Sequence, residues 1–180
     1  TGKTAVSDPI VSKIDGSVVV VFAVPLKTNG QVSGVLVAIR DGNILSDITD
    51  QLTFGKSGTA FMINRDGTAI AHQNREMVLN MDNNFENVKS DVRLASLVEL
   101  EKKMVAGETG VGTYEYNGLV KYMAYAPVEG MPWFLAVTAP KDEVLAGVHD
   151  LRNEFLIISA IFMFIGIAAT FVIARGIVRP

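Results

Sequence analysis

Residues 155–174 form a run without a single charged side chain, and only Ser159 and Thr170 within it are polar. As an α-helix the run would be about 30 Å long, which matches the thickness of the hydrocarbon core of a bilayer. A helix buried in a soluble core is the alternative, but such a helix rarely continues for so long without a charge. The sequence therefore predicts a C-terminal transmembrane helix over residues 155–174.

Basic residues are distributed unevenly on the two sides of this run. Arg175 and Arg179 follow it closely, whereas residues 140–154 hold only Lys141 and Arg152, among several acidic side chains. Because lysine and arginine concentrate on the cytoplasmic side of a membrane span, the pattern favours a cytoplasmic C-terminus. We therefore expect a protein of the cell membrane whose N-terminal part lies outside the cytoplasm.

The charge balance and the residue types exclude several classes of protein. The net charge is −3 and the sixteen lysines and arginines are scattered, whereas a nucleic-acid-binding domain concentrates its basic residues on one face. Without cysteine, the chain has no disulfide framework and no thiolate metal site. The chain opens on a polar segment without an initiator methionine, so we expect a piece of a longer protein.

Asp-Gly or Asn-Gly pairs at residues 15–16, 29–30, 66–67 and 117–118 punctuate the chain before the apolar run, and strand-forming residues flank each of them. This pattern is typical of antiparallel hairpins. Helices are expected over residues 45–52 and 91–106, the second with Ser90 as its N-cap, and a third helix begins at Pro140. The sequence thus predicts an α+β fold of antiparallel sheets flanked by helices. The expected strands are residues 9–14, 18–26, 32–40, 59–64, 68–72, 112–116, 120–127 and 133–139.

Two stretches about 100 residues apart resemble each other. Asp15-Gly16 precedes Pro25 by the same spacing that separates Asn117-Gly118 from Pro127, and in each copy a strand, a turn and a strand lead into a helix. We interpret this as an internal duplication. Three strands with nothing to bury against are not stable alone, and few residues precede the first copy. We therefore expect the first copy to lack its N-terminal half.

No motif typical of catalysis or of metal binding occurs. The two histidines, His72 and His149, lack carboxylates at a metal-ligand spacing, and no nucleophile or nucleotide motif is present. Gly-Lys-Ser-Gly at residues 55–58 lacks the earlier glycine of a phosphate-binding loop, so it predicts a turn. His72 is interpreted as a turn residue bonded to the backbone. We expect no enzyme activity, no cofactor and no metal here.

The segment GKSGTAFMINRDG at residues 55–67, followed by Ile-Ala-His at residues 70–72, resembles the membrane-proximal module of a double Cache (dCache) sensor. Such sensors are extracytoplasmic, PAS-like ligand-binding domains of bacterial receptors. The stretch that begins with YMAYAPV at residues 122–128 and continues to Pro140 is similar to a later part of the same module. Residues 7–38, from Ser-Asp-Pro to Gly-Val-Leu-Val-Ala, resemble the closing strands of the membrane-distal module. Residues 175–180 resemble the opening of a HAMP linker.

The resemblance implies a division of the chain. Residues 1–52 would be the remnant of the membrane-distal Cache module, and residues 53–140 the membrane-proximal module. A juxtamembrane helix, residues 141–154, would join the span at 155–174 to the start of HAMP at 175–180. The resemblance also implies the sensor region of a methyl-accepting chemotaxis protein, which relays small-molecule binding to cytoplasmic signalling proteins. The alternatives are the sensor of a histidine kinase or a diguanylate cyclase, and a membrane-anchored binding protein without output.

The family also suggests where a ligand would bind. Amino-acid-binding members carry an aspartate on the last strand of the distal module, and matching that strand to this sequence puts Ile39 at the aspartate position. Isoleucine cannot pair with an ammonium group, although Asp41 lies two residues on, on the same strand face. Ile39 and Asp41 are thus the candidate ligand-binding residues, and an ordinary loop role for Asp41 is the alternative.

The helix that opens at Pro140 shows a spacing suited to pairing. Val144, Val148, Leu151 and Phe155 follow a 4-3-4 pattern, which forms an apolar seam along one side of a helix. The seam would meet a second subunit in a homodimer or a preceding transmembrane helix, and packing on the receptor's own domain is the alternative. A continuous helix could then carry a ligand-dependent shift across the membrane, provided that the ligand prefers one of two states.

Overall fold

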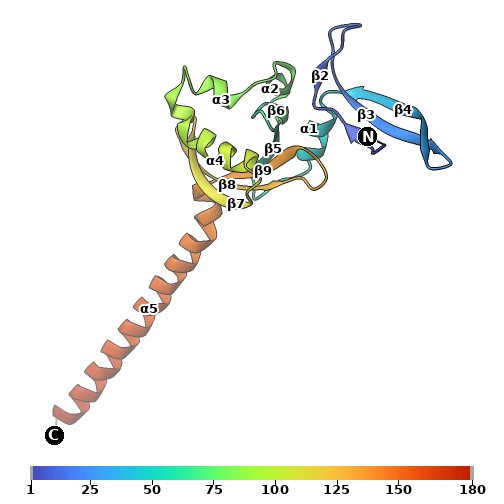
Figure 1. The fold of residues 1–180 in the computed structure, drawn as a ribbon. Coiled ribbons are helices and arrows are strands. Elements are labelled where there is room, and N and C mark those ends of the chain that lie inside the picture. Colours follow the sequence, from blue (N-terminus) through green and yellow to red (C-terminus); the bar gives the residue numbers. More distant parts are fainter. Residues whose placement is uncertain (1, 179–180) are drawn as a thin grey trace. The chain divides into compact units, whose positions relative to one another are not determined.

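The computed structural model describes residues 2–178, although the side chains of residues 147–153, 168–174 and 176–178 lie outside that description. The chain divides into two compact units, Thr1–Lys141 and Asp142–Pro180. The first unit contains two antiparallel sheets with short helices, and the second is almost all of one long helix (Figure 1). The predicted α+β class with antiparallel sheets is confirmed.

The N-terminal sheet is built around one long hairpin. Strands β3 (Val18–Thr28) and β4 (Gln31–Asp41) pair along their length, and β1 (Ala5–Val6) and β2 (Ile10–Val11) pair with β3 on its other edge. Asn29 and Gly30 make the turn with φ of 51° and 80°. That left-handed backbone is favoured by Asn-Gly, so the first long hairpin forms where the sequence predicts it.

The second sheet has the strand order β6-β5-β9-β8-β7 (Figure 1). The predicted pairs at residues 66–67 and 117–118 form its β5–β6 and β7–β8 turns. Strand β9 lies in the centre because β5 pairs with one of its edges and β8 with the other. The strands are β5 (Thr59–Asn64), β6 (Ala69–Ala71), β7 (Gly110–Tyr116), β8 (Leu119–Pro127) and β9 (Trp133–Pro140).

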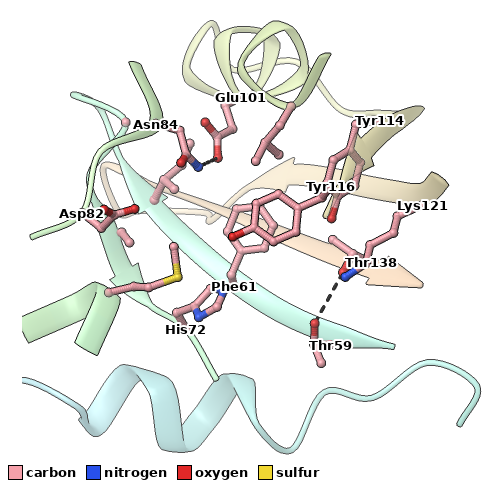
Figure 2. Close-up of a pocket in the computed structure, with 15 residues that line it drawn as sticks. Thr59, Phe61, His72, Asp82, Asn84, Glu101, Tyr114, Tyr116, Lys121 and Thr138 are labelled. Atoms are coloured by element: carbon pink, nitrogen blue, oxygen red, sulfur yellow. Dashed lines mark hydrogen bonds between the residues drawn. The ribbon is translucent and has the colours of Figure 1, made fainter. Parts of the chain in front are cut away.

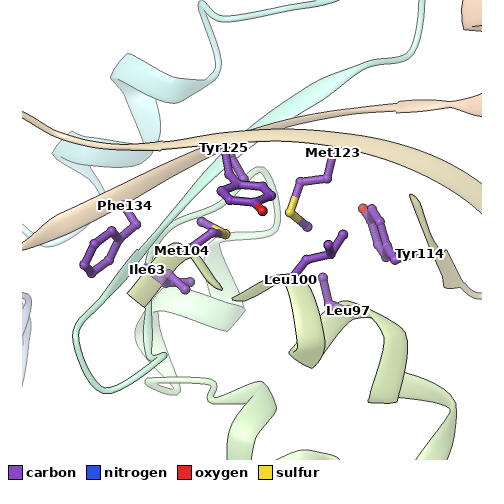
Figure 3. Packing of buried hydrophobic residues seen from close by; sticks show 9 residues of the cluster. Ile63, Leu97, Leu100, Met104, Tyr114, Met123, Tyr125 and Phe134 are labelled. Atoms are coloured by element: carbon purple, nitrogen blue, oxygen red, sulfur yellow. The ribbon is translucent and has the colours of Figure 1, made fainter. Parts of the chain in front are cut away.

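Helix α4 (Ala95–Val105) covers one face of the second sheet. Its Leu97, Leu100 and Met104 pack on Met123 and Phe134 from the sheet (Figure 3). Met104 and Met123 are fully buried. Leu97, Leu100 and Met104 recur at intervals of three and four residues, so one side of the helix supplies this core.

The opposite face of the second sheet packs on the N-terminal sheet and on helix α1 (Ile44–Thr49). Val20 of β3 and Leu45 of α1 join Met62, Ile70 and Trp133 in a second buried cluster. Because this cluster draws residues from both sheets, burial of apolar surface holds the N-terminal sheet against the second one.

A half-buried carboxylate also joins the two sheets. The Asp8 Oδ1 atom accepts a hydrogen bond from the Trp133 indole Nε1–H at 2.6 Å, and Oδ2 accepts one from Asn64 Nδ2 at 3.0 Å. Asp8 lies between β1 and β2, whereas Trp133 and Asn64 are paired residues of β9 and β5. The sequence gives no sign of this link, because its members are far apart along the chain.

Three short helical segments lie between β6 and α4: α2 (Arg75–Leu79), α3 (Asn84–Asn87) and the 3-10 helix η1 (Val92–Leu94). The single predicted helix over residues 91–106 is therefore divided, and the predicted N-cap Ser90 is wrong. Asp91 caps η1 by accepting from Arg93 N, while the Ser90 hydroxyl donates to the Asn87 carbonyl. Helices α2 and α3 escape prediction because each is about one turn long and is held by an asparagine cap.

Helix α5 (Lys141–Val178) begins directly after β9, as the proline at residue 140 predicts. Among the residues that the structure describes, no helix is both long and apolar enough to cross a membrane. The predicted span at residues 155–174 is helical, but the side chains of 168–174 lie outside the description. The span therefore stays a prediction, as do the proposed boundaries at residues 52, 140, 154 and 174. Residues 179–180 of the predicted HAMP start are also outside the described chain.

Candidate functional site

The predicted ligand residues Ile39 and Asp41 lie near the end of β4. Ile39 pairs with Val21 and Asp41 pairs with Val19 of β3. Because paired residues of antiparallel strands share a face, this face is the one opposite Val20, which is buried against the second sheet. The predicted shared face of Ile39 and Asp41 therefore follows from the register.

Both candidate residues are exposed. The Ile39 side chain is 61% accessible, and Asp41 accepts a hydrogen bond from the Asn43 backbone N–H through Oδ1 at 2.8 Å. With this bond Asp41 takes the ordinary loop role before a helix that was its alternative interpretation. The bond uses Oδ1, so Oδ2 of the carboxylate can still accept a hydrogen bond from another partner. In the described structure, this face of β4 is an open strand surface.

A cavity of about 60 Å³ lies within the second sheet's module, on the face that α4 covers (Figure 2). Alternate residues of β5, Thr59, Phe61 and Ile63, point into it because successive strand side chains alternate between faces. Their partners on β9 and β8 complete the floor, and α4 with the segment around α3 forms the opposite wall. The polar or aromatic lining residues are Thr59, Phe61, His72, Asp82, Asn84, Glu101, Tyr114, Tyr116, Lys121 and Thr138.

Glu101 is the most unusual lining residue. Its side chain is fully buried on α4, and one carboxylate oxygen, Oε1, accepts a hydrogen bond from Asn84 Nδ2 at 2.8 Å. The other oxygen, Oε2, has no hydrogen-bond partner although it is buried. Burial raises the pKa of Glu101 to about 7, the Asn84 hydrogen bond opposes that rise, and the nearby charge of Asp82 adds to it. An unpartnered buried carboxyl oxygen is costly, so it needs an explanation.

Asp82 and His72 lie on the same wall of the cavity (Figure 2). Asp82 Oδ1 accepts from Asn87 Nδ2 at 3.0 Å. The His72 Nδ1 atom accepts from the Asn74 backbone N–H at 2.9 Å, as its predicted turn role requires, and this leaves Nε2 as the donor of a neutral ring. Burial lowers the pKa of His72, which favours that neutral ring.

Tyrosines and a lysine form the other end of the cavity. The Lys121 ammonium lies 5.7 Å from the centre of the Tyr116 ring, within cation–π range. Burial raises the pKa of Tyr114 to about 12, although a hydrogen bond with Thr138 acts against the rise. Tyr114 therefore stays a neutral phenol, and the cavity has an acidic end and a basic end separated by aromatic rings (Figure 2).

A second hollow, of about 520 Å³, lies beside the loop between α1 and β5. Its lining includes the predicted turn at residues 55–58 and is largely exposed. Gly58 is fixed there because a Cβ atom would approach the Phe54 carbonyl oxygen to 2.1 Å. Residues 55–57 form a turn, and a strand rather than a helix follows, so the rejection of a phosphate-binding loop is confirmed.

Within the part of the chain that the structure describes, no three histidine, cysteine or acidic side chains are grouped to hold a metal ion. His149 lies among the residues whose side chains are not described, so its surroundings are not assigned. His72 lies beside the Phe61 ring instead, with 6.3 Å between the two ring centres. The cavity is therefore equipped for binding through hydrogen bonds, charge and aromatic contact.

Glu101 was missed by reasoning from the sequence, although the signal was present. It lies four residues after Leu97 and three before Met104, both of which belong to the apolar side of the predicted helix. A carboxylate at this position of a helix must be buried with the apolar side chains. A charged residue inside an apolar stripe is thus the pattern that could have located the cavity.

The sequence of this chain matches the model of a known family. The Cache domain model dCache_1 matches residues 1–148. The chain belongs to the Cache domain family. The resemblance stated from residues 55–67 and 122–128 is therefore confirmed, and it extends over most of the described chain.

Methyl-accepting chemotaxis proteins are similar to this chain over nearly its whole length. McpB of Bacillus subtilis (strain 168), a methyl-accepting chemotaxis protein, is 29% identical over 180 residues, which cover 99% of this chain and 24% of McpB. The chain spans about a quarter of the length of the curated relatives it matches.

Solved structures show the same fold. The ligand-binding domain of the amino acid chemoreceptor PctB of Pseudomonas aeruginosa PAO1, in complex with L-Arg, matches with a TM-score of 0.59 and 22% identity. The match covers 85% of this chain and 56% of that structure. The extracellular domain of mmHK1S-Z3, described as a histidine kinase, gives a TM-score of 0.62 and 20% identity over 83% of this chain and 53% of its own.

Proposed function

We propose that this chain is the extracytoplasmic ligand-sensing and transmembrane signalling segment of a methyl-accepting chemoreceptor. The observation that carries the proposal is the extent of the similarity to McpB, which covers 99% of the chain. The family match ends at residue 148, whereas the similarity to McpB covers 99% of the chain and therefore includes most of α5. A sensor domain and its connecting helix are thus shared together.

In this proposal the chain is organised along the path of a signal. Residues 1–52 close a membrane-distal Cache module, residues 53–140 form the membrane-proximal module, and residues 141–154 continue as a juxtamembrane helix. Residues 155–174 cross the membrane and residues 175–180 begin a HAMP linker in the cytoplasm. The uncharged run and the arginines that follow it support this topology.

The exposure of the N-terminal sheet supports the hypothesis that residues 1–52 are only part of the distal module. Strand β4 is exposed along nearly all of its length, although it is rich in valine, leucine and isoleucine. Strands with such composition are normally covered on both faces. We infer that a preceding segment of the natural protein covers the face that carries Ile39 and Asp41, and that a small molecule binds between them.

The ligand of the distal module is proposed to be a small molecule, in line with PctB, whose ligand-binding domain is solved with L-Arg. Ile39 has no carboxylate that could pair with an amino group. The carboxylate of Asp41, through its Oδ2 atom, is therefore the acidic group that could pair with it at this face. Signalling would follow through a homodimer that uses the apolar seam of Val144, Val148, Leu151 and Phe155, with non-enzymatic output to cytoplasmic signalling proteins.

Membrane topology is tested first. The sequence contains no cysteine, so an introduced cysteine is the single thiol that a maleimide can label. Single Lys3→Cys and Arg175→Cys variants are expressed in intact cells and exposed to a membrane-impermeant maleimide. We expect rapid labelling at residue 3 and labelling at residue 175 only after the cells are lysed. Equal labelling of the two positions in intact cells would refute the membrane topology.

Signalling is tested in a chimera that joins this chain to the cytoplasmic part of a characterised chemoreceptor. Insertion of a short run of glycines after Leu151 should abolish ligand control of the associated kinase, because a flexible linker cannot transmit a small helix displacement. Insertion of the same glycines in the exposed turn at Asn117 and Gly118 is the matched comparison, and the ligand should still regulate the kinase in that variant. Unchanged control with glycines after Leu151 would refute transmission by a rigid helix.

The second candidate is the sensor segment of a histidine kinase. The fold similarity to mmHK1S-Z3, with a TM-score of 0.62, favours it, and a diguanylate cyclase or a binding protein without output would fit the same outer fold. The sequence that follows residue 180 in the natural protein separates these cases. Long heptads with methylation sites indicate a chemoreceptor, and a phosphoacceptor helix indicates a kinase.

A further inference from the structure

Glu101 leaves one buried oxygen without a partner in a module that is otherwise completely folded. Oε1 is used by Asn84, whereas Oε2 has neither a hydrogen bond nor contact with solvent. The second buried side-chain atom without a partner in the described part of the chain is Asn43 Oδ1, which does not line this cavity. Glu101 is thus the group in the cavity that calls for a partner from outside the chain.

The charges around Glu101 decide which kind of partner fits. Asp82 lines the same cavity and is close enough to raise the pKa of Glu101 by its own negative charge. An anion placed between them would be repelled by both acidic groups, whereas a cation would be attracted by both. Lys121 lies toward the opposite end of the cavity, beside Tyr116 (Figure 2), so it does not neutralise the acidic end.

The remaining walls suit a small organic cation rather than a hydrated metal ion. Phe61, Ile63, Ala69, Met77 and Leu97 supply apolar contacts, and Phe61 presents an aromatic ring beside the acidic end (Figure 2). Aromatic rings and carboxylates together bind ammonium groups. Metal binding needs several oxygen or nitrogen ligands arranged around one point, and no such group of acidic and histidine side chains occurs in the described chain.

The size of the cavity limits the ligand. A single water needs about 10–15 Å³ on this kind of measure, so the cavity of about 60 Å³ holds roughly four such groups. An ammonium group with one or two carbons fills that space. A side chain as long as that of arginine or lysine does not.

We propose that this cavity is a second ligand site of the chain, and that it binds a small alkylammonium ion through the carboxylates of Glu101 and Asp82, both of which line it. The site is separate from the β4 surface of Ile39 and Asp41, because the two lie in different sheets. It does not depend on the proposed sensory output, so it can be tested by binding alone.

The test uses the complete chain in detergent micelles and titrates it with methylammonium and ethylammonium chloride in a calorimeter. We expect saturable binding of one ion per chain to the wild type. Glu101→Gln should weaken the affinity at least tenfold, because a hydrogen bond to a charged partner is worth about 1.5–3 kcal/mol. Glu99→Gln, the same change at an exposed position of α4, is the matched control and should bind as the wild type does.

Three results would overturn the proposal. The first is no saturable binding up to tens of millimolar, which would mean that a water alone occupies the cavity. The second is equal binding to the wild type and to Glu101→Gln. The third is saturable binding of sodium acetate instead of the ammonium salts, which would mean that a protonated Glu101 serves an anion.

A second measurement covers the case in which Glu101→Gln folds poorly. Nuclear Overhauser contacts between the ethylammonium protons and the rings of Phe61 and Tyr114 are recorded on the wild type. Contacts to these rings are expected if the ion occupies the cavity. Contacts confined to the exposed surface of β4 would place the ion elsewhere and refute the proposed site.

Discussion

The two sheets of the first unit use the same chain pattern in opposite surroundings. In each, a strand, a tight turn and a strand lead into a helix: β3, β4 and α1 in the N-terminal sheet, and β8, β9 and α5 in the second. Yet β9 is buried or half-buried at every position, whereas β4 is exposed at every position except Gly34. The difference shows that the side chains of similar strands are buried only where other elements pack on them.

The cover of the second sheet comes from elements that the N-terminal sheet lacks. Helix α4 and the strands β5 and β6 precede β8 and β9 in the chain and enclose their side chains. Beside β3 the N-terminal sheet has only the two short strands β1 and β2 and the exposed strand β4 among the described residues. The second sheet therefore encloses a cavity, whereas β4 stays exposed.

The largest effect is expected from removing one buried apolar side chain in the second sheet and one exposed apolar side chain in the N-terminal sheet. Met123→Ala removes a fully buried side chain and should lower the free energy of unfolding by roughly 2–5 kcal/mol. Leu36→Ala, at a β4 position that is 62% accessible, should change it by less than about 0.5 kcal/mol. Urea unfolding followed by the fluorescence of Trp133 measures both. Equal losses would show that β4 is packed as tightly as the second sheet.

The buried acid of the second region should make stability depend on pH. The folded pKa of Glu101 is about 7, against a reference of 4.5, so the folded state binds the proton more tightly than the unfolded state. The stabilisation is fully present below pH 4.5 and is lost as the pH rises through 7. The loss should approach about 3 kcal/mol by pH 8.

The Glu101→Gln variant isolates this effect. Its unfolding free energy is subtracted from that of the wild type at each pH, which cancels the opposite contribution of His72, whose lowered pKa costs stability as the pH falls. Glu99→Gln should keep the wild-type pH dependence. A difference between wild type and Glu101→Gln that stays constant from pH 4 to 8 would contradict a buried, titrating Glu101.

The link between the two regions should have an intermediate effect. Asp8→Ala leaves the Trp133 indole N–H and the Asn64 amide without their shared acceptor, and we expect a loss of about 2 kcal/mol. Asp47→Ala is the comparison, because Asp47 is 68% accessible and Arg75 keeps Asp50 as a second partner. That change should cost less than about 0.5 kcal/mol. Thermal unfolding measures both, and equal costs would mean that Asp8 does not fasten the sheets.

The smallest expected effect compares two asparagines at helix starts, one in each region. Asn83 caps α3 by accepting from Phe85 N and Glu86 N, so Asn83→Ala should cost about 1 kcal/mol. Asn43 precedes α1 but makes no side-chain cap bond, and its buried Oδ1 has no partner. Asn43→Ala should therefore leave the melting temperature unchanged or raise it. A marked loss for Asn43→Ala would reveal a partner for that oxygen.

Much of the strand pattern could be predicted from local chemistry. An Asn-Gly or Asp-Gly pair favours a tight turn because its backbone reaches the left-handed region at little cost. The four pairs predicted as hairpin turns, at residues 15–16, 29–30, 66–67 and 117–118, all join antiparallel strands. Strand β5 was predicted at its observed bounds, because turns on both sides delimit it. The predicted membrane span and module boundaries are untested, and Ile39 and Asp41 remain a prediction.

The site of the second module could not be assembled from the sequence in the same way. Glu101, Asn84 and Asp82 come from three segments between β6 and β7, and the short helices that place them depend on asparagine caps. The link from Asp8 to Trp133 spans most of the chain. Contacts of this kind have no local signal, because they exist only after the elements have packed.

The sequence by itself determined where the chain turns, which segments are strands, and which family the chain belongs to, because these follow from backbone preferences and short apolar patterns. Only the tertiary structure decided that one carboxylate of α4, that of Glu101, is buried beside a small cavity with one of its two oxygens unpartnered. It also decided that the faces of β4 stay open while those of β9 close. Burial is set by what packs on a strand, and the strand's own residues do not contain that information.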